Sequence, residues 1–118
     1  MAVKTFTAGA DLTGKFGYAV VASATNKVVT LPANANDICL GILMNDNTSG
    51  KVVGVALPGE VCKVKLGGAV NFGAELKTAA GGALVAAGGT GDDKVIAKAL
   101  EDGASGDLIY AVVENFIK

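Results

Sequence analysis

The chain of 118 residues contains no histidine and no tryptophan, and all ten of its cations are lysines, so arginine is absent as well. Histidine is the commonest general base and metal ligand, so its absence removes the usual centre of acid–base and metal chemistry. Without arginine, no planar guanidinium is available for bidentate contacts with phosphates or bases. The formal net charge of −1 also disfavours nucleic acid as a partner, because binding through phosphates requires a basic surface.

Aromatic residues are scarce at 5%, although 51% of the chain is hydrophobic. The apolar content is therefore mostly alanine and valine, which pack as thin layers rather than around bulky anchors. No run of about 18 apolar residues exists, so we expect no membrane-spanning helix and no membrane partner. The opening residues 1–7 do not continue into an apolar segment, so no secretion signal is expected.

The two cysteines, Cys39 and Cys62, each lie within an apolar run. We favour two buried, reduced thiols, because cytosolic chains rarely carry disulfides. A bridge between them stays open as an alternative if their two strands are neighbours.

One segment, Gly9–Phe16, nearly matches a phosphate-binding P-loop. It fails at its eighth position, because Phe16 cannot ligate magnesium as serine or threonine would, and the residues that follow favour a strand rather than a helix. Serine and cysteine side chains are present but have no histidine or well-placed lysine as a base. We therefore predict no enzymatic activity and no catalytic, cofactor-binding or metal-binding residues.

The central part of the chain shows the clearest pattern. Val52–Leu57 is apolar on both sides apart from one glycine, whereas Glu60–Leu66 alternates, with Lys63 and Lys65 on its wet face. Between them, Pro58–Gly59 has the chemistry of a type II turn. That turn twists the wrong way for a tight hairpin, so we interpret it as a corner between strands and keep the tight hairpin as the second interpretation.

Short apolar runs separated by glycine, asparagine and aspartate turns recur every eight to twelve residues or so, which is typical of small β-sandwiches and barrels. The run at 94–100 could also form a helix, and the one at 83–86 could be a flexible loop. We predict a mostly all-β fold, a small β-barrel or β-sandwich of short antiparallel strands with a loosely ordered N-terminal arm. The arm covers residues 1–12, and a single β-rich domain covers 13–118. Further strands are expected over Tyr18–Ala22, Lys27–Leu31, Ile38–Met44, Lys94–Leu100 and Leu108–Val113, and a short strand at Ala83–Ala86 stays open as the alternative to a loop.

Three of these runs, Ile38–Met44, Val52–Leu57 and Leu108–Val113, are apolar on both faces. A single core covers only one face of each strand. Either loops of the same chain cover the other faces, or some of these faces meet another protein, such as a sister subunit or a larger scaffold. We favour the second interpretation for at least some of them.

Several glycine-rich β motifs resemble one known family. They match in order and rough spacing from about Gly41 to Val113, and less well before that. The motifs are Gly41-Ile-Leu, Gly50-Lys-Val-Val-Gly-Val-Ala-Leu-Pro-Gly-Glu-Val, Lys63-Val-Lys-Leu-Gly-Gly-Ala-Val, Gly73-Ala-Glu-Leu, Ala97-Lys-Ala-Leu-Glu and Gly106-Asp107. On these residues the chain resembles the phage capsid cement, or head decoration, proteins.

The resemblance implies a structural virion protein that binds the outside of a phage head and stabilises the mature lattice by clamping neighbouring major capsid subunits. It implies a homotrimer on the capsid exterior, made in the bacterial cytoplasm, without a cofactor. By position in the chain alone, it assigns capsid contact to Val3, Lys4, Thr5 and Phe6. The alternatives are a small β-barrel module that binds a carbohydrate or another ligand, for which Tyr18, Tyr110 and a few phenylalanines are aromatic candidates, and a minor tail or head-joining subunit.

Overall fold

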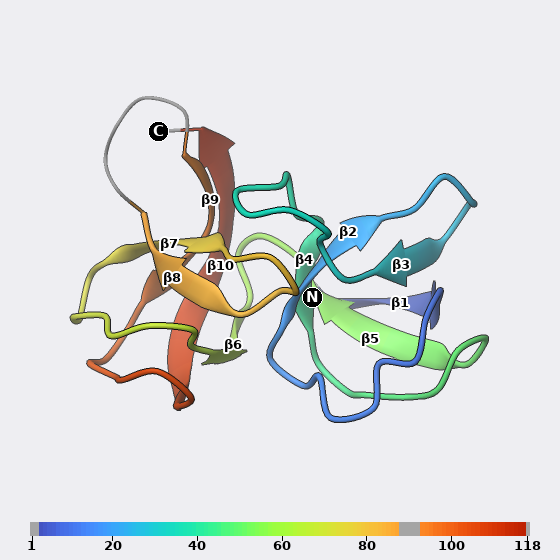
Figure 1. Ribbon diagram of the computed structural model, residues 1–118, viewed down its shortest axis with the longest axis horizontal. Coiled ribbons are helices and arrows are strands. Elements are labelled where there is room, and N and C mark those ends of the chain that lie inside the picture. Colours follow the sequence, from blue (N-terminus) through green and yellow to red (C-terminus); the bar gives the residue numbers. More distant parts are fainter. Residues whose placement is uncertain (1–2, 88–92, 118) are drawn as a thin grey trace.

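The computed structural model describes residues 3–87 and 93–117, and within these ranges it consists of ten strands and no helix. The predicted all-β fold is therefore confirmed. The strands form a closed barrel and a five-stranded sheet, which stand side by side in Figure 1. The strands are β1 Val3–Ala8, β2 Ala19–Ala22, β3 Val28–Thr30, β4 Gly41–Leu43, β5 Val52–Ala56, β6 Val61–Lys65, β7 Glu75–Thr78, β8 Leu84–Ala86, β9 Lys94–Ala99 and β10 Leu108–Ile117.

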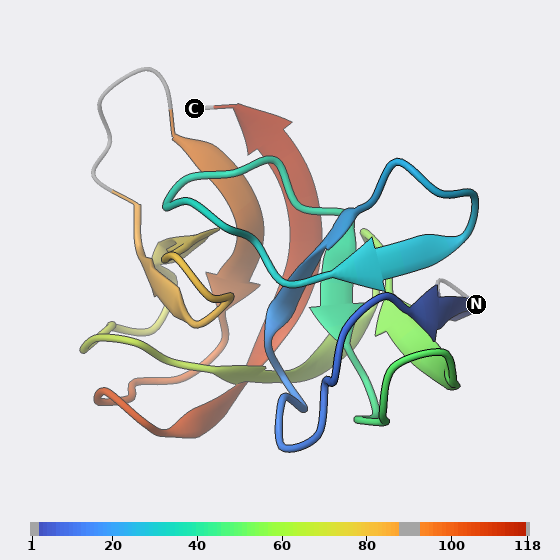
Figure 2. The ribbon, with the colours of Figure 1, turned by 45° about the vertical axis from the view of Figure 1, so that its right-hand side comes forward.

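The barrel has the strand order β1-β3-β2-β4-β5 and closes between its first and last members. Strand β1 pairs antiparallel with β5, from Val3 opposite Ala56 to Thr7 opposite Val52, and parallel with β3. Figure 2 shows β1 (dark blue) and β5 (green) side by side. Closure leaves no open sheet edge in this part of the molecule.

The pairing of β1 corrects the expectation of a loosely ordered arm. Residues Val3–Ala8 are an integral barrel strand, because β5 would otherwise expose a row of unpaired backbone groups. Ala8 is buried and Phe6 is half-buried against the barrel core. The first two residues of the predicted arm lie outside the described residues. The loop that follows β1 is also tied down, since Leu12 is fully buried.

The second sheet has the order β6-β10-β9-β7-β8 with antiparallel pairing throughout. Its two outermost strands approach each other, because Leu66, directly after β6, forms a parallel bridge with Leu84 in β8. The sheet therefore curls towards closure. The predicted strand at Lys94–Leu100 is confirmed as β9, and of the two alternatives left open at Ala83–Ala86 the structure has the strand, as β8.

The interior contains two apolar clusters, which explains two of the three runs that are apolar on both faces. One cluster fills the barrel and includes Leu43, Val53 and Val55, and the other lies between barrel and sheet and includes Ile42 and Ala56. Alternate residues of β4 and β5 thus enter different clusters. For these two strands the chain itself covers both faces, except at Val52, which is 60% exposed at the start of β5.

The corner at Pro58–Gly59 connects the two parts. The Glu60 N–H donates to the Leu57 carbonyl at 3.2 Å, and Gly59 has φ +100°, which is the geometry of a type II turn. Strand β5 before the corner belongs to the barrel, and β6 after it belongs to the sheet. The interpretation as a corner rather than a tight hairpin is confirmed.

Backbone hydrogen bonds hold the barrel against the sheet. The Ala19 N–H donates to the Gly82 carbonyl at 2.8 Å, and the Lys65 N–H donates to the Gly17 carbonyl at 2.9 Å. A third bond runs from the Asn36 N–H to the Thr78 carbonyl at 2.9 Å. Because these bonds accompany the shared apolar cluster, we expect barrel and sheet to move as one unit.

The strand predicted at Ile38–Met44 is shorter in the structure, where only Gly41–Leu43 is β4. Gly41 lies at the start of β4, close to the paired strand β5: a Cβ there would collide with the Ala56 carbonyl oxygen and lie 2.7 Å from a Val55 methyl group. The segment before it is not a strand, and Ile38 is 64% exposed. Glycine at this position therefore permits the close backbone approach that places Ile42 between the two parts.

Both cysteines are free thiols buried in the cluster between barrel and sheet. Burial raises the pKa of each thiol to about 11, with nearby Asp37 adding to the effect at Cys39 and Glu60 at Cys62, while a hydrogen bond with Thr78 opposes it at Cys39. The structure therefore has the two buried, reduced thiols that we favoured and no bridge between them.

Gly41→Ala is predicted to lower the free energy of unfolding by about 2 kcal/mol, because the added methyl group must displace the Ala56 backbone. Gly68→Ala is the matched control: its Cβ would meet only a Val85 methyl group at 3.8 Å, so a change within about 0.5 kcal/mol is expected. Urea denaturation of both variants measures the difference. Equal stability of the two would show that the approach of β4 to β5 is not as close as described.

Thiol labelling tests the environment of the cysteines. In native protein we expect slow labelling whose rate continues to rise from pH 9 towards pH 11, because the thiolate forms only near the raised pKa of about 11. The neutral thiols contribute fully to the free energy of unfolding below pH 9. This contribution is lost as the pH rises through about 11. Unfolded protein is the control, and a native labelling rate that levels off near pH 9 would contradict the burial.

Candidate interaction surface

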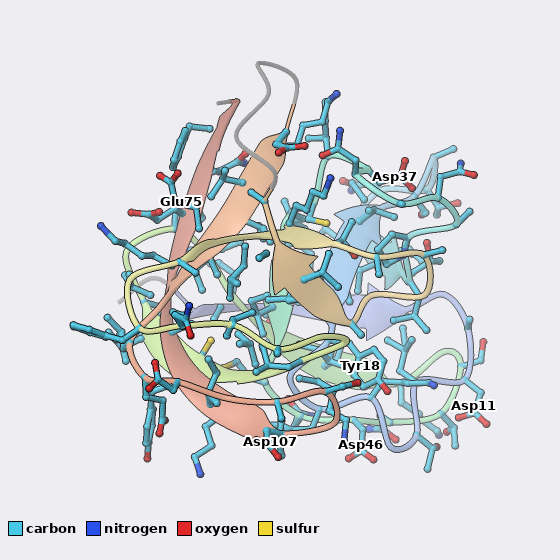
Figure 3. The ribbon with its side chains drawn as sticks, turned by 60° about the vertical axis from the view of Figure 1, so that its left-hand side comes forward. Asp11, Tyr18, Asp37, Asp46, Glu75 and Asp107 are labelled. Carbon is cyan, nitrogen blue, oxygen red and sulfur yellow. The ribbon has the colours of Figure 1, made fainter. Side chains whose placement is uncertain are left out.

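The carboxylates of the described residues mostly organise turns. Thr13 donates to Asp11 through its hydroxyl at 2.6 Å and its N–H at 3.1 Å, and these bonds lower the pKa of Asp11. The Asp107 carboxylate accepts the Ala104 N–H at 2.9 Å. Figure 3 shows these carboxylates spread over the molecule rather than converging. In the part of the chain that the structure describes, no three histidine, cysteine, aspartate or glutamate side chains are grouped as metal ligands would be.

The P-loop-like segment is occupied by a carboxylate. The Gly14 N–H donates to the Asp46 carboxylate at 2.6 Å. A carboxylate of the protein itself therefore uses an N–H group that a P-loop would offer to a phosphate oxygen. The segment leads from β1 into the turn before β2, and no helix begins there. It serves to join two loops of the barrel. Among the described residues, the structure contains no helix long and apolar enough to cross a membrane.

Strand β10 is the third run that is apolar on both faces, and it differs from the other two. Ile109, Ala111 and Val113 are buried in the cluster between barrel and sheet, whereas Leu108 and Tyr110 are 42% and 52% exposed. The described residues of the chain cover only one face of this strand. The hypothesis of a face left for another protein therefore stays a prediction for β10 alone.

The register places other apolar side chains beside these. Across the sheet, Val61 is opposite Val112, and Lys63 is opposite Tyr110. Val61 is 51% exposed and Leu100, at the end of β9, is 39% exposed. We call this side of the sheet the outer face, and it comprises Val61, Lys63, Lys65, Lys98, Leu100, Leu108, Tyr110 and Val112.

Two carboxylates fix the backbone at the edge of the outer face. Glu101 accepts the Tyr110 N–H at 2.8 Å, and Asp102 accepts the Phe72 N–H at 2.7 Å. The ammonium group of Lys63 lies 5.1 Å from the centre of the Tyr110 ring, a cation–π distance. The outer face thus has a defined shape before any partner binds.

None of the six aromatic residues is buried. Phe72 is 70% exposed and Phe116 is 39% exposed, while Phe6, Phe16 and Tyr18 are half-buried. Phenylalanine is usually among the more buried residue types, and exposed aromatic residues are typical of the energetic centres of protein interfaces. The aromatic content of this chain is therefore concentrated where a partner can reach it.

The residues predicted for capsid contact lie at one end of the barrel. Lys4 and Thr5 are exposed on β1, while Val3 pairs with Ala56 through its backbone. Phe6 lines a hollow of about 270 Å³ together with Leu40 and the β2–β3 connection, and a second hollow of about 200 Å³ with Val52. Of the predicted residues, Thr5 and Phe6 therefore line a partly apolar surface, and Lys4 is exposed beside them on β1.

Sequence reasoning missed the outer face, apart from β10 itself. The alternation in β6 predicts that Lys63 and Lys65 face solvent, but it does not predict that apolar side chains lie beside them. Phe72 lies in a loop, and only the bridge of Val70 with Gly103 and the bond from Phe72 to Asp102 bring it to the sheet. One pattern in the sequence does indicate this face. Leu108, Tyr110 and Val112 lie on the same side of a strand and are apolar, whereas the solvent-facing side of a strand is usually polar.

The sequence matches no protein-family profile and no curated protein. Among solved structures, the chain is similar to the crystal structure of the head fiber gp8.5 N base of bacteriophage phi29, with a TM-score of 0.72. The sequences are 20% identical, and the likeness covers 95% of this chain and 92% of that one. Nearly the whole chain therefore has the fold of that head-fiber base.

Proposed function

We propose that this protein is a structural component of a bacteriophage head that binds the outer surface of the capsid. The observation that carries the proposal is the likeness in fold, over almost the full length of both chains, to a protein described as a phage head-fiber base. The sequence resemblance to capsid cement proteins points the same way from different evidence. An uncovered apolar sheet face fits a protein that acts by contact rather than by catalysis.

In this proposal the protein stabilises the mature lattice by clamping neighbouring major capsid subunits. A ligand that binds only the mature lattice stabilises it by mass action, by about 2.7 kcal/mol per site when its free concentration is about 100 times the Kd. As a homotrimer, the protein gains avidity, because its second and third contacts form within one complex. Weak individual contacts then suffice for stable attachment.

The barrel end with Lys4, Thr5 and Phe6 is the proposed capsid contact. It offers an exposed cation, an exposed hydroxyl and a half-buried aromatic ring beside two hollows. A projecting capsid side chain fits such a surface, with the ring supplying apolar contact and the lysine attracting an acidic group. Because Val3–Ala8 is a barrel strand, deleting it would damage the fold, so point substitutions are the suitable test.

The proposed location is the capsid exterior, after synthesis in the host cytoplasm. Two buried reduced thiols agree with folding in a reducing compartment.

The alternative of a carbohydrate-binding module finds less support in the structure. Such a module needs a bare aromatic platform, but lysines lie over both tyrosine rings, Lys15 over Tyr18 at 4.9 Å and Lys63 over Tyr110 at 5.1 Å, which leaves the phenylalanines, of which Phe72 is 70% exposed. The capsid protein therefore remains the partner that we propose.

Co-sedimentation with phage particles tests the function. The purified protein is expected to sediment with mature heads and poorly with unexpanded proheads, because only the mature lattice presents the complete site. Added protein should also raise the temperature at which undecorated heads release DNA. Binding to neither particle would contradict the proposal and favour a tail subunit or a ligand-binding module.

A charge reversal tests the barrel end. Lys4→Glu is expected to weaken binding to mature heads by about tenfold, since it reverses an exposed charge at the proposed contact. Lys51→Glu is the matched control, because Lys51 is exposed and lies beside Ala8 at the opposite end of β1, roughly 13 Å away. Equal effects of the two substitutions would remove the barrel end as the contact.

A further inference from the structure

We infer that the outer face of the second sheet binds a second copy of this chain, related to the first by a rotation axis parallel to β10. The inference rests on the proposed function for its setting and deepens it by naming the surface through which subunits meet. Its evidence is independent of the capsid, however, and comes from the exposure, register and charge of the residues on this face.

The apolar side chains of the outer face form one continuous patch. Leu108 and Tyr110 follow each other on the exposed side of β10, Val61 lies on the neighbouring β6, and Leu100 lies on β9 on the other side. The Leu100 N–H donates to the Tyr110 carbonyl at 2.9 Å, so these two residues are direct neighbours. A patch spanning three strands is larger than the single exposed apolar residues that any surface carries.

Other exposed apolar side chains do not form such a patch. Ile38 is 64% exposed in the segment before β4, and Val52 is 60% exposed at the start of β5. Both belong to the barrel, away from the outer face. They are as exposed as Tyr110, so they provide controls for exposure without contiguity.

Charges of opposite sign flank the patch. Lys63 and Lys65 lie on β6 at one side, and Glu101 and Asp102 lie in the β9–β10 connection at the other. The strand order puts β10 between them, so the two flanks are separated by roughly 10 Å, two strand spacings. At the Leu108 end of β10 the surface is therefore polarised across the strands, whereas at the Val112 end the β9 side carries Lys98, opposite Val112 and beside Glu75 of β7.

This polarity selects the partner. A partner surface must have an apolar centre with a basic flank and an acidic flank in the opposite order, and a second copy of the outer face has both. Rotation about an axis parallel to β10 brings the Lys63 and Lys65 flank of one subunit against the Glu101 and Asp102 flank of the next, with apolar centres together. Rotation about an axis across the strands would instead oppose lysine to lysine, which is unfavourable.

The acidic flank is already ordered for such a contact. One oxygen of Glu101 accepts the Tyr110 N–H and one oxygen of Asp102 accepts the Phe72 N–H, so both carboxylates are held in place. Among the described residues, these two bonds use one oxygen of each carboxylate. The other oxygen can accept a hydrogen bond from a lysine of the next subunit. Fixed carboxylates lose little conformational freedom on binding, which favours association.

Sedimentation velocity over a wide range of concentration tests the contact. The wild-type chain is expected to self-associate, and the double variant Leu108→Thr with Tyr110→Thr is expected to weaken association by at least about tenfold, because it removes the apolar centre. Threonine keeps the β propensity of the strand. Ile38→Thr and Val52→Thr remove equally exposed apolar groups elsewhere and should leave association unchanged.

A second pair of substitutions isolates the charges. Glu101→Gln and Asp102→Asn keep an oxygen to accept the Tyr110 and Phe72 N–H groups but remove both negative charges. The double variant should associate more weakly, and its association should no longer weaken as salt is added, as that of the wild type should. Circular dichroism and thermal melting confirm that each variant is folded.

Two outcomes would overturn the inference: a wild-type chain that is monomeric at all concentrations, or an oligomer that the outer-face variants leave intact. These outcomes are distinct from failure of the proposed function. A monomer that sediments with mature heads would retain the capsid role and lose this contact. An oligomer that depends on Tyr110 but binds no head would retain this contact and lose the capsid role.

Discussion

A strand that is apolar on both faces must be covered on both, and in this protein β4 and β5 meet that requirement by lying between two cores. Leu43 and Val55 point into the barrel, while Ile42 and Ala56 point towards the second sheet. Covering both faces releases the hydrophobic free energy of each, at roughly 25 cal/mol per Å² of apolar surface. The barrel therefore has a core of its own and shares a second core with the sheet, so the two parts stabilise each other.

Close approach of backbones explains the glycines at two positions. Gly41 leaves room for the paired strand β5, and Gly17 leaves room for the second sheet where the barrel contacts it. At Gly17 a Cβ would lie 3.1 Å from the Lys65 backbone nitrogen, where the barrel contacts β6. Thin layers also keep the two backbones close enough for the hydrogen bonds that join them.

Local patterns in the sequence predicted local structure well. The alternation in β6, the corner at Pro58–Gly59 and the β character of β9 each depend on residues within a few positions of one another, and each is confirmed. The all-β class follows from the regular recurrence of such patterns. These features were accessible because their physical causes are short-range.

The features that sequence reasoning missed depend on pairing between distant segments. A local signal for a strand is present in β1, since the β-branched residues Val3, Thr5 and Thr7 occupy alternate positions. From the sequence we nonetheless assign β1 to an arm, because the partners of this strand are remote in the sequence. The two cores were anticipated as one for the same reason. The outer face is a further case, since Val61 and Val112 become neighbours only through the register of β6 with β10.

The distribution of aromatic residues connects this architecture with recognition. The core of the described residues is built mainly from alanine, valine, leucine and isoleucine, and none of the six aromatic residues is buried in it. The backbone N–H groups of Tyr110 and Phe72 each donate to a carboxylate, which orders the backbone at these two exposed residues. An ordered backbone loses little conformational freedom on binding, which favours contact between exposed aromatic residues and a partner protein.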